Sequence, residues 1–425
     1  MIDIKLIREN PELVKSNIKK KFQDYKLKLV DEIKEIDDEW RKIRYKADNL
    51  RKERNSISEN INKAKKEKNN KKADELIKKA KKIPEELKEL EEQENGLLKK
   101  INELLSQIPN IIDESVPIGK DETKNKEIRK FGKIKKYNFP LKTHVELIES
   151  LDLGDFEASS KVAGKGFYYL KGKLALLNQA LIRFAIDHMV KKKYEYIETP
   201  IMLNEKSIFA SMDRKAIEES VYSIKDEDLN LIGTAEQSLL AMHSDDTIKE
   251  EDLPKKYLSY SICFRKEIGA HGINERGLWR THQFNKVEQF IFSKPEDSKK
   301  LYNELLKNSE EILKQLKLPY RVIEICSGDL ADWKNKNADI EVYRPTTKDY
   351  GEVVSLSNCT DYQARKLNIK CIDKHGNRRI LHTLNDTAIA TGRIMVAILE
   401  NNQQKDGSIK IPQVLHKYTG FKEIK

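Results

Sequence analysis

Apolar positions in the first 110 residues follow a heptad pattern. One run covers residues 33–64 and a second covers residues 76–108, with apolar side chains separated by alternating steps of three and four. Only Arg54 and Glu94 interrupt these positions. Such a stripe is typical of a helix that packs along a narrow seam against another helix. The pattern therefore predicts two long helices that form a coiled coil.

A short polar break over residues 65–71 separates the two runs and leaves room only for a tight turn. We expect the helices to form an antiparallel hairpin about 50 Å long, from the rise per helical residue. Pro84 lies inside the second run, where it should kink the helix or restart it. A hairpin with one narrow seam has no globular core. We therefore expect it to project, either to dimerise or to reach a large ligand.

The pattern changes after the hairpin. Residues 113–143 are polar and charged, and we interpret them as a connecting segment that Phe131 and Phe139 pin in place. Helical spacing follows at residues 174–192, and short alternating runs predict strands at residues 194–199, 256–267, 283–293, 320–326, 339–344, 352–357 and 379–384. Because few helical crossovers separate these runs, the pattern favours an α+β fold with an antiparallel sheet flanked by helices.

Composition narrows the classes of partner. The chain of 425 residues has 81 Lys+Arg against 70 Asp+Glu, a net charge of +11 that favours nucleic acid, although a lysine-rich proteome would give the same excess. Lysines gather around the break in the hairpin, where they fit either phosphate contacts or a solvated flank. The 4 cysteines have no metal-ligand spacing, so we expect reduced thiols and no zinc. No segment has the length of a membrane span, and we expect a cytoplasmic protein.

Two adjacent predicted strands carry charged and aromatic side chains on one face. Arg265 and Glu267 are two positions apart on the first strand, and Phe284, Lys286 and Glu288 alternate along the second. A guanidinium, an aromatic ring and carboxylates together fit an anionic, planar ligand such as a nucleotide. A solvated hairpin with cross-strand ion pairs would show the same spacing. No Gly-x-Gly-x-x-Gly or Walker pattern follows a predicted strand, so a nucleotide would be bound without a Rossmann or P-loop site.

These residues resemble a known motif. Phe-Arg-x-Glu, a polar loop over residues 269–280 that we expect to be mobile, and His-Gln-Phe-x-Lys-Val-Glu are similar to motif 2 of class II aminoacyl-tRNA synthetases, in the form carried by seryl-tRNA synthetases. The resemblance extends from Met1 almost to the C-terminus. It implies an N-terminal tRNA-binding arm over residues 1–112, the connecting segment 113–143 and a class II catalytic domain over residues 144–425.

The resemblance implies an ATP site. In this family Arg265 would hold the α-phosphate, Glu267 would read the adenine and Phe284 would stack on it. Arg393 matches the arginine of motif 3, which holds the far phosphate and is catalytic together with Arg265. The alternative is a structural salt bridge, for instance with Glu400 or with a neighbouring strand. The implied ATP-binding set is Arg265, Lys266, Glu267, Thr281, Phe284, Glu352, Val353, Val354, Ser355 and Arg393, of which Glu352 and Ser355 would also hold Mg²⁺.

The resemblance also implies an amino-acid site. Thr234, Ala235 and Glu236 resemble the family's Thr-x-Glu, in which Glu236 takes the substrate's ammonium group. Glu288 and Thr387 would bind the serine hydroxyl and its surroundings. Buried acceptors of this kind would reject alanine, because alanine leaves them without a donor.

The chain departs from the family at one point. Many members carry Asn-Gly-Ser before the motif 3 helix, where this chain has Asn385-Asp386-Thr387. Thr387 keeps a hydroxyl group. The added carboxylate of Asp386 has no assigned role, and capping of the helix is one interpretation.

The implied function is ATP-dependent serine–tRNA ligation by a homodimer, with the motif 1 segment 194–202 at the dimer interface. The arm would grip tRNA(Ser), and tRNA(Sec) is a second candidate substrate. Two other classes remain open: a non-catalytic RNA-binding scaffold, and an enzyme that loads an amino acid onto a carrier protein. The phosphate-facing residues argue against the scaffold, and the arm argues against the carrier-protein ligase.

Overall fold

The computed structural model describes residues 1–267 and 276–425. Its contacts divide the chain into two compact units, which we call the arm and the body and describe separately. The arm comprises residues 2–19 and 23–108, and the body comprises residues 1, 20–22 and 109–425. Most of the loop predicted between the motif 2 strands, residues 269–275, lies outside the described residues. In the described part of the chain, no helix combines the length and apolar character needed to cross a membrane.

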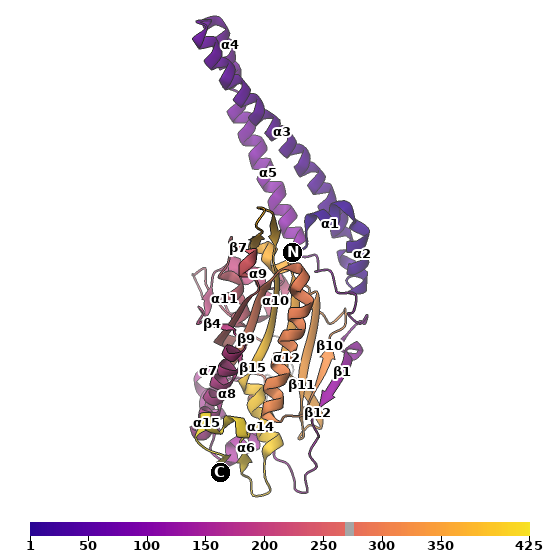
Figure 1. Cartoon of the computed structure of the whole chain (residues 1–425), viewed down its shortest axis with the longest axis vertical. Helices are drawn as coiled ribbons and strands as arrows, with labels where there is room; N and C mark the ends of the chain where they lie inside the picture. The colour runs from indigo at the N-terminus through magenta and orange to yellow at the C-terminus, as the bar shows by residue number, and fades with distance from the viewer. Residues whose placement is uncertain (268–275) are drawn as a thin grey trace. The chain divides into compact units, whose positions relative to one another are not determined.

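The arm is an antiparallel helical hairpin, which confirms the heptad prediction. Figure 1 shows its long helix α3 running alongside α5. The helices of the arm are α1 (Ile4–Glu9), α2 (Pro11–Lys20), α3 (Leu27–Lys66), α4 (Asn70–Ala80) and α5 (Ile83–Leu105). The seam between α3 and the two returning helices buries Ile33, Ala47, Ile57, Ala64, Ala73, Ile83, Leu87 and Ile101.

Two breaks shape the hairpin. At the tip, Lys68 adopts a left-handed φ of 56°, and the side chain of Asn69 caps α4 by accepting a hydrogen bond from the backbone N–H of Lys72. At the second break, Pro84 lies in the first turn of α5, where a missing backbone N–H is tolerated. The proline therefore restarts the helix, which was one of its two predicted effects. The heptad analysis did not predict α1 and α2, whose apolar stripes are short.

The body is built on an eight-stranded sheet with the order β1-β10-β11-β12-β15-β9-β8-β4. Among the described strands of this sheet, neighbours are antiparallel except for β4 and β8, which confirms the predicted α+β class. The strands are β1 (Lys126–Phe131), β4 (Glu195–Tyr196), β8 (Lys255–Phe264), β9 (Gln283–Ser293), β10 (Tyr320–Glu324), β11 (Lys336–Arg344), β12 (Asp349–Thr360) and β15 (His382–Ala390).

Helices cover both faces of this sheet. One face packs against α8 (Gly172–Lys191), α12 (Ser298–Leu316) and α14 (Thr391–Asn402), and it forms the main apolar core. A second core on the other face includes residues of α11 (Ala235–Ala241) and α13 (Tyr362–Lys366). The remaining longer helices are α6 (His144–Ser150), α7 (Phe156–Ala163), α9 (Glu205–Ser211) and α10 (Arg214–Ser220).

The pleat of β9 separates the main core from charged side chains. Val287 and Ile291 point into the main core, and Gln289 on the same face donates to the hydroxyl of Ser309 in α12. The alternate residues, including Lys286 and Glu288, point to the opposite face. The strand matches the predicted range 283–293. Its alternation of side chains places Lys286 and Glu288 on the face that carries the candidate site.

Several predicted strands were wrong in their extent; for example, only Glu195–Tyr196 of the predicted range 194–199 forms a strand. The first motif 2 strand ends at Phe264 and not at residue 267. Its ladder closes where the N–H of Arg265 donates to the carbonyl of His282, after which Lys266 donates to Ser220 and Glu267 takes a φ of 52°. The strand predicted at 379–384 is split between β14 (Arg378–Ile380) and β15, which belong to different sheets.

The segment predicted to connect the arm to the catalytic domain forms part of the body. Its strand β1 pairs with β10 at the edge of the large sheet. Phe131 stacks on Tyr320 with ring centroids 5.3 Å apart. Arg129 adds an ion pair of 2.6 Å with Glu310 of α12. The expectation that an aromatic residue pins this segment is confirmed for Phe131.

Two neighbouring seam positions of α3 test the packing of the arm. Ile57 is 7% exposed, whereas Arg54, at the preceding heptad position, is exposed. We expect Ile57→Ala to lower the free energy of unfolding by about 2 kcal/mol or more. Arg54→Ala should change it by less than about 0.5 kcal/mol. Thermal unfolding of the full chain, followed by far-UV circular dichroism, measures both; equal effects would show that α3 packs along a different face.

Candidate active site

A cavity of about 300 Å³ opens on the charged face of the large sheet, lined by residues of β9, β12, β15, α10, α11 and α14 and by residues that follow the end of β8. It brings together most of the residues that the sequence predicted for the ATP and serine sites. The predicted residues that line it are Thr234, Glu236, Arg265, Glu267, Thr281, Phe284, Glu288, Glu352, Val353, Ser355, Thr387 and Arg393.

Three predicted residues do not line the cavity. Ala235 is fully buried in the first turn of α11, where it packs behind its neighbours Thr234 and Glu236. Val354 belongs to the main apolar core on the other side of β12. Lys266 follows the end of β8 and contributes a backbone hydrogen bond to Ser220. The structure therefore gives these three side chains no direct place in the site.

Two arginines line the cavity, and both act on the carboxylate of Glu352; we call the part that they line the arginine end. Arg265 is held by its Nε, which donates to the carbonyl of Gly233 at 3.2 Å, and its guanidinium lies 5.2 Å from the centre of the Phe284 ring. Arg393, at the start of α14, forms an ion pair of 3.2 Å with the Glu352 carboxylate. Burial would raise the pKa of Glu352, but Arg393 and Arg265 outweigh that effect and lower it. Two guanidiniums at one end of a cavity are suited to phosphate groups.

Arg393 has a carboxylate partner on a neighbouring strand, which was one of the two salt-bridge alternatives considered from the sequence. The other alternative named Glu400, which lies seven positions later on α14. The structure pairs Arg393 with Glu352 instead, and it uses Glu400 in a separate network described below. Because Glu352 itself lines the cavity, this ion pair keeps Arg393 within the site.

A second group of lining residues consists of buried polar and charged side chains on β9 and β15. Glu288 is fully buried, forms an ion pair of 2.6 Å with Lys286, and accepts a hydrogen bond of 3.1 Å from the side-chain amide of Asn385. Thr387 lies directly opposite Glu288 in the β9–β15 ladder. Charged groups buried in this way carry a desolvation cost that their own pairing only partly offsets. Such groups are typical of a ligand site.

Glu236 is a second buried carboxylate in this part of the cavity. Gln363 of α13 donates to it at 2.7 Å, while the side-chain hydroxyl of Thr234 caps α11 by accepting from the N–H of Glu236 at 3.2 Å. Burial, and secondly the charge of Glu288, raise the pKa of Glu236. A cationic group between the two carboxylates would relieve this repulsion.

The residues at Glu352 fit a magnesium site. Glu352 and Ser355 both line the cavity and offer a carboxylate and a hydroxyl oxygen. Asp339 lies across the ladder from Ser355. Burial, and then the nearby Glu352, raise the pKa of Asp339, so a divalent cation here would be stabilising. The described residues contain no cluster of three or more His, Cys, Asp or Glu side chains suited to a metal. Mg²⁺ that shares its oxygen ligands with phosphates needs only one or two carboxylates.

Asp386 does not cap a helix, so that interpretation was wrong. It lies inside β15, before the first residue of α14. Its side chain is fully buried on the α12 side of the sheet, where it accepts hydrogen bonds from Ser309 at 2.6 Å and Gln289 at 2.9 Å. Burial raises its pKa well above the usual range. The hydroxyl of Ser309 also donates to the carbonyl of Thr387. Asp386 and Ser309 therefore join β15 to α12 on the face opposite the cavity.

Comparison with known proteins identifies the family of this chain. A model of the seryl-tRNA synthetase N-terminal domain matches residues 1–112, and a model of the tRNA synthetase class II core domain (G, H, P, S and T) matches residues 220–402. A serine–tRNA ligase from Methanospirillum hungatei is 48% identical over 318 residues, which cover 74% of this chain and 75% of that protein. The chain belongs to the seryl-tRNA synthetase family. The family predicted from motif 2 is therefore confirmed.

Solved structures resemble the synthetase over its length. The crystal structure of seryl-tRNA synthetase from Pyrococcus horikoshii, complexed with ATP, is 44% identical with a TM-score of 0.92 and covers 100% of this chain and 99% of that chain. The cytoplasmic serine–tRNA ligase from Naegleria fowleri, in complex with AMP, is 33% identical with a TM-score of 0.86 and the same coverage. The catalytic fold is thus that of a class II aminoacyl-tRNA synthetase.

Several residues of the synthetase's cavity were not among the predicted site residues. Lys286 and Asn385 had a local signal, since each lies two positions from a predicted residue on the same strand face. Other lining residues come from segments whose place in the cavity depends on the tertiary fold: Trp279, Arg280, Trp333 and Lys334. Of these, Arg280 forms an ion pair of 2.8 Å with Glu267 and holds it beside the cavity.

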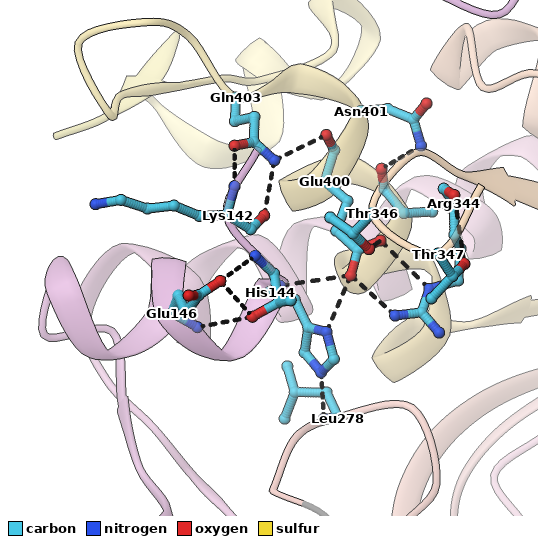
Figure 2. A network of polar contacts seen from close by, with 12 residues as sticks. Lys142, His144, Glu146, Leu278, Arg344, Thr346, Thr347, Glu400, Asn401 and Gln403 are labelled. Atoms are coloured by element: carbon cyan, nitrogen blue, oxygen red, sulfur yellow. Dashed lines mark hydrogen bonds and ion pairs between the residues drawn. The ribbon is translucent and has the colours of Figure 1, made fainter. Parts of the chain in front are cut away.

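Behind the arginine end of the cavity, a polar network centres on Glu400 (Figure 2). The buried carboxylate accepts hydrogen bonds from the His144 ring at 3.1 Å, from Arg344 at 2.9 Å and from Thr346 at 2.7 Å. Burial alone would raise the pKa of Glu400. The bonds from His144 and Arg344 outweigh that effect and lower the pKa to about 2.

The lowered pKa predicts a pH-dependent contribution to stability. A depressed carboxyl pKa stabilises the fold above the unfolded value of 4.5, and the contribution is lost as the pH falls toward 2. Glu400→Gln should therefore lower the free energy of unfolding by about 3 kcal/mol at neutral pH. The difference from wild type should fall to less than half by about pH 3. Urea unfolding at several pH values measures this difference, and a difference independent of pH would contradict the assignment.

Proposed function

We propose that the cavity activates L-serine with ATP, and that the synthetase then transfers serine to the 3′ end of tRNA(Ser). Serine–tRNA ligation is the activity named for the relatives that match this chain. One observation carries the proposal for the site: two arginines, Arg265 and Arg393, line the same cavity as the buried carboxylates Glu236 and Glu288. The first pair suits a triphosphate, and the second suits a small substrate with an ammonium and a hydroxyl group.

Each group has a role in the first half-reaction. Glu236 binds the ammonium group of serine, and Glu288 and Thr387 bind its hydroxyl group. An oxygen of the serine carboxylate attacks the α-phosphorus of ATP and forms a new oxygen–phosphorus bond. The bond from this phosphorus to the oxygen that bridges the α- and β-phosphates breaks, and pyrophosphate leaves. Arg265 stabilises the negative charge that develops at the α-phosphate, and Arg393 holds the far phosphate. In the second half-reaction a terminal ribose hydroxyl of the tRNA attacks the carbonyl, and AMP leaves.

The remaining predicted residues complete the ATP site. The Phe284 ring stacks on adenine, and Glu267, held by Arg280, accepts from its exocyclic amine. Glu352 and Ser355 would hold Mg²⁺, which supplies positive charge to the phosphates when bound.

We propose that the arm binds tRNA. Ten lysines near its tip are exposed: Lys63, Lys65, Lys66, Lys68, Lys71, Lys72, Lys78, Lys79, Lys81 and Lys82. A long hairpin without a globular core, with cations gathered at its tip, is suited to the phosphates of a nucleic acid. We also propose a cytoplasmic homodimer that joins through residues 194–202, where β4 forms an edge of the large sheet. tRNA(Sec) remains a second candidate substrate.

Arg265→Ala tests the site directly. Because this guanidinium meets the α-phosphate, its loss should lower serine-dependent ATP–pyrophosphate exchange by about a thousandfold or more. Arg276→Ala is the matched control, since Arg276 pairs with Glu149 outside the cavity and should leave exchange unchanged. Normal exchange by the folded Arg265→Ala variant would refute the assignment.

Deletion of residues 30–108, joined by a short glycine linker, tests the arm. The cavity is lined by residues of the body, so exchange should continue, while aminoacylation of tRNA(Ser) should fall by at least about a hundredfold from the lost phosphate contacts. Equal charging by the deletion variant would show that the arm does not hold RNA. Transfer of serine to a carrier protein in place of tRNA would favour the alternative ligase.

A further inference from the structure

The network behind the arginine end contains a histidine in a defined protonation state. The backbone N–H of Leu278 donates to Nε2 of His144 at 3.3 Å, so Nε2 must carry its lone pair. Nδ1 lies 3.1 Å from Glu400 and is therefore the protonated nitrogen, which donates to the carboxylate. Figure 2 shows the ring between the Glu400 carboxylate and Leu278. His144 thus links the last helix of the site, α14, to the backbone that follows the motif 2 loop.

Three glycines leave room for this backbone. Gly277 has a φ of 140°, and a Cβ atom on it would lie 2.4 Å from Nε2 of His144. A Cβ on Gly351 of β12 would lie 2.2 Å from the Trp279 ring, and one on Gly392 of α14 would lie 2.9 Å from the carbonyl oxygen of Leu278. Residues 277–279 therefore lie in close contact with β12 and α14. A side chain at any of these three glycines would clash with a neighbouring atom in this arrangement.

Trp279 contacts Arg393 and so links the backbone at residues 277–279 to the guanidinium of Arg393. Nε of Arg393 donates to the carbonyl of Trp279 at 3.3 Å, and its guanidinium lies 5.5 Å from the centre of the indole ring. The guanidinium of Arg344 lies 4.4 Å from the same ring and also binds Glu400. Glu400 therefore anchors two side chains, His144 and Arg344, that hold the segment on which Arg393 rests.

The helix adds a second, rigid connection. Arg393 and Glu400 are seven positions apart on α14, about two turns, so they lie on the same face of the helix. The anchor at Glu400 fixes one end of this face, and the contact with Trp279 fixes the guanidinium at the other.

We infer that His144 is a positioning residue for ATP: it holds the backbone at Leu278 and Trp279 so that Arg393 is directed at the phosphates. The inference rests on the proposed function, because it takes ATP as the ligand of the arginine end. His144 does not line the cavity. Its loss should therefore weaken ATP binding without a matching effect on the serine end, where Glu236 and Glu288 are held by other residues.

Two substitutions separate the roles of the two ring nitrogens. His144→Asn places an amide nitrogen near the position of Nδ1, so it can still donate to Glu400, but it has no atom that reaches Leu278. His144→Gln places an amide oxygen near the position of Nε2, where it can accept from Leu278. We expect the Asn variant to raise the KM for ATP in pyrophosphate exchange, and the Kd for ATP, about tenfold, with the KM for serine within twofold. The Gln variant should recover most of the ATP affinity.

Arg129→Gln is the control for a general loss of stability. It breaks the ion pair with Glu310 of α12, and neither residue lines the cavity. It should lower the melting temperature without changing the affinity for ATP. Gly351→Ala provides a second route should the His144 variants fail to fold, since the added methyl group displaces Trp279 while His144 and Glu400 stay intact. It should also raise the KM for ATP selectively.

Equal ATP affinity in wild type and the Asn variant, or a KM for serine that rises as much as that for ATP, would overturn the inference. For Gly351→Ala, an unchanged KM for ATP would do the same. The direct titration of ATP onto the full chain needs no serine, so it keeps this test separate from the proposed function. A wild-type protein that binds ATP but exchanges no pyrophosphate with serine would refute the proposed function alone.

Discussion

The site depends on one antiparallel ladder in which the strand pleat sends apolar side chains to one face and charged side chains to the other. Strands β8, β9, β15 and β12 are neighbours in the sheet, so their charged faces form one floor. The buried ion pair Lys286–Glu288 forms there because the two residues lie two positions apart on β9 and so share its charged face. Their desolvation is offset by the apolar core on the opposite face, which packs against α8, α12 and α14.

The buried carboxylates Glu236 and Glu288 lower the stability of the fold. Glu236 and Glu288 are both buried and lie close enough for the charge of Glu288 to raise the pKa of Glu236. Apolar residues of similar size would give a more stable sheet. A site that binds an ammonium group must nevertheless keep its carboxylates, and partners such as Gln363 and Asn385 limit the loss by holding each one in place.

Much of this site could be predicted because its signals are local. The period of two in residues 283–293 predicted the full extent of β9, and the heptads predicted the hairpin that α3, α4 and α5 form. Predictions that depended on distant partners were incomplete. The strand ends before Glu267, where the backbone N–H of Lys266 donates to the carbonyl of Ser220. The buried carboxylate of Asp386 accepts a hydrogen bond from Ser309 of α12. The Glu400 network joins residues 256 positions apart, and no pattern in one sequence indicates such a contact.

The central claim is that buried carboxylates beside paired arginines select serine for activation by ATP. Pyrophosphate exchange by the wild-type protein, measured with each proteinogenic amino acid in turn, tests it most directly. The account predicts strong exchange with serine and exchange with alanine lower by about four orders of magnitude, because alanine leaves Glu288 without its hydroxyl donor. Comparable exchange with alanine, or a preference for an amino acid without a hydroxyl group, would contradict it.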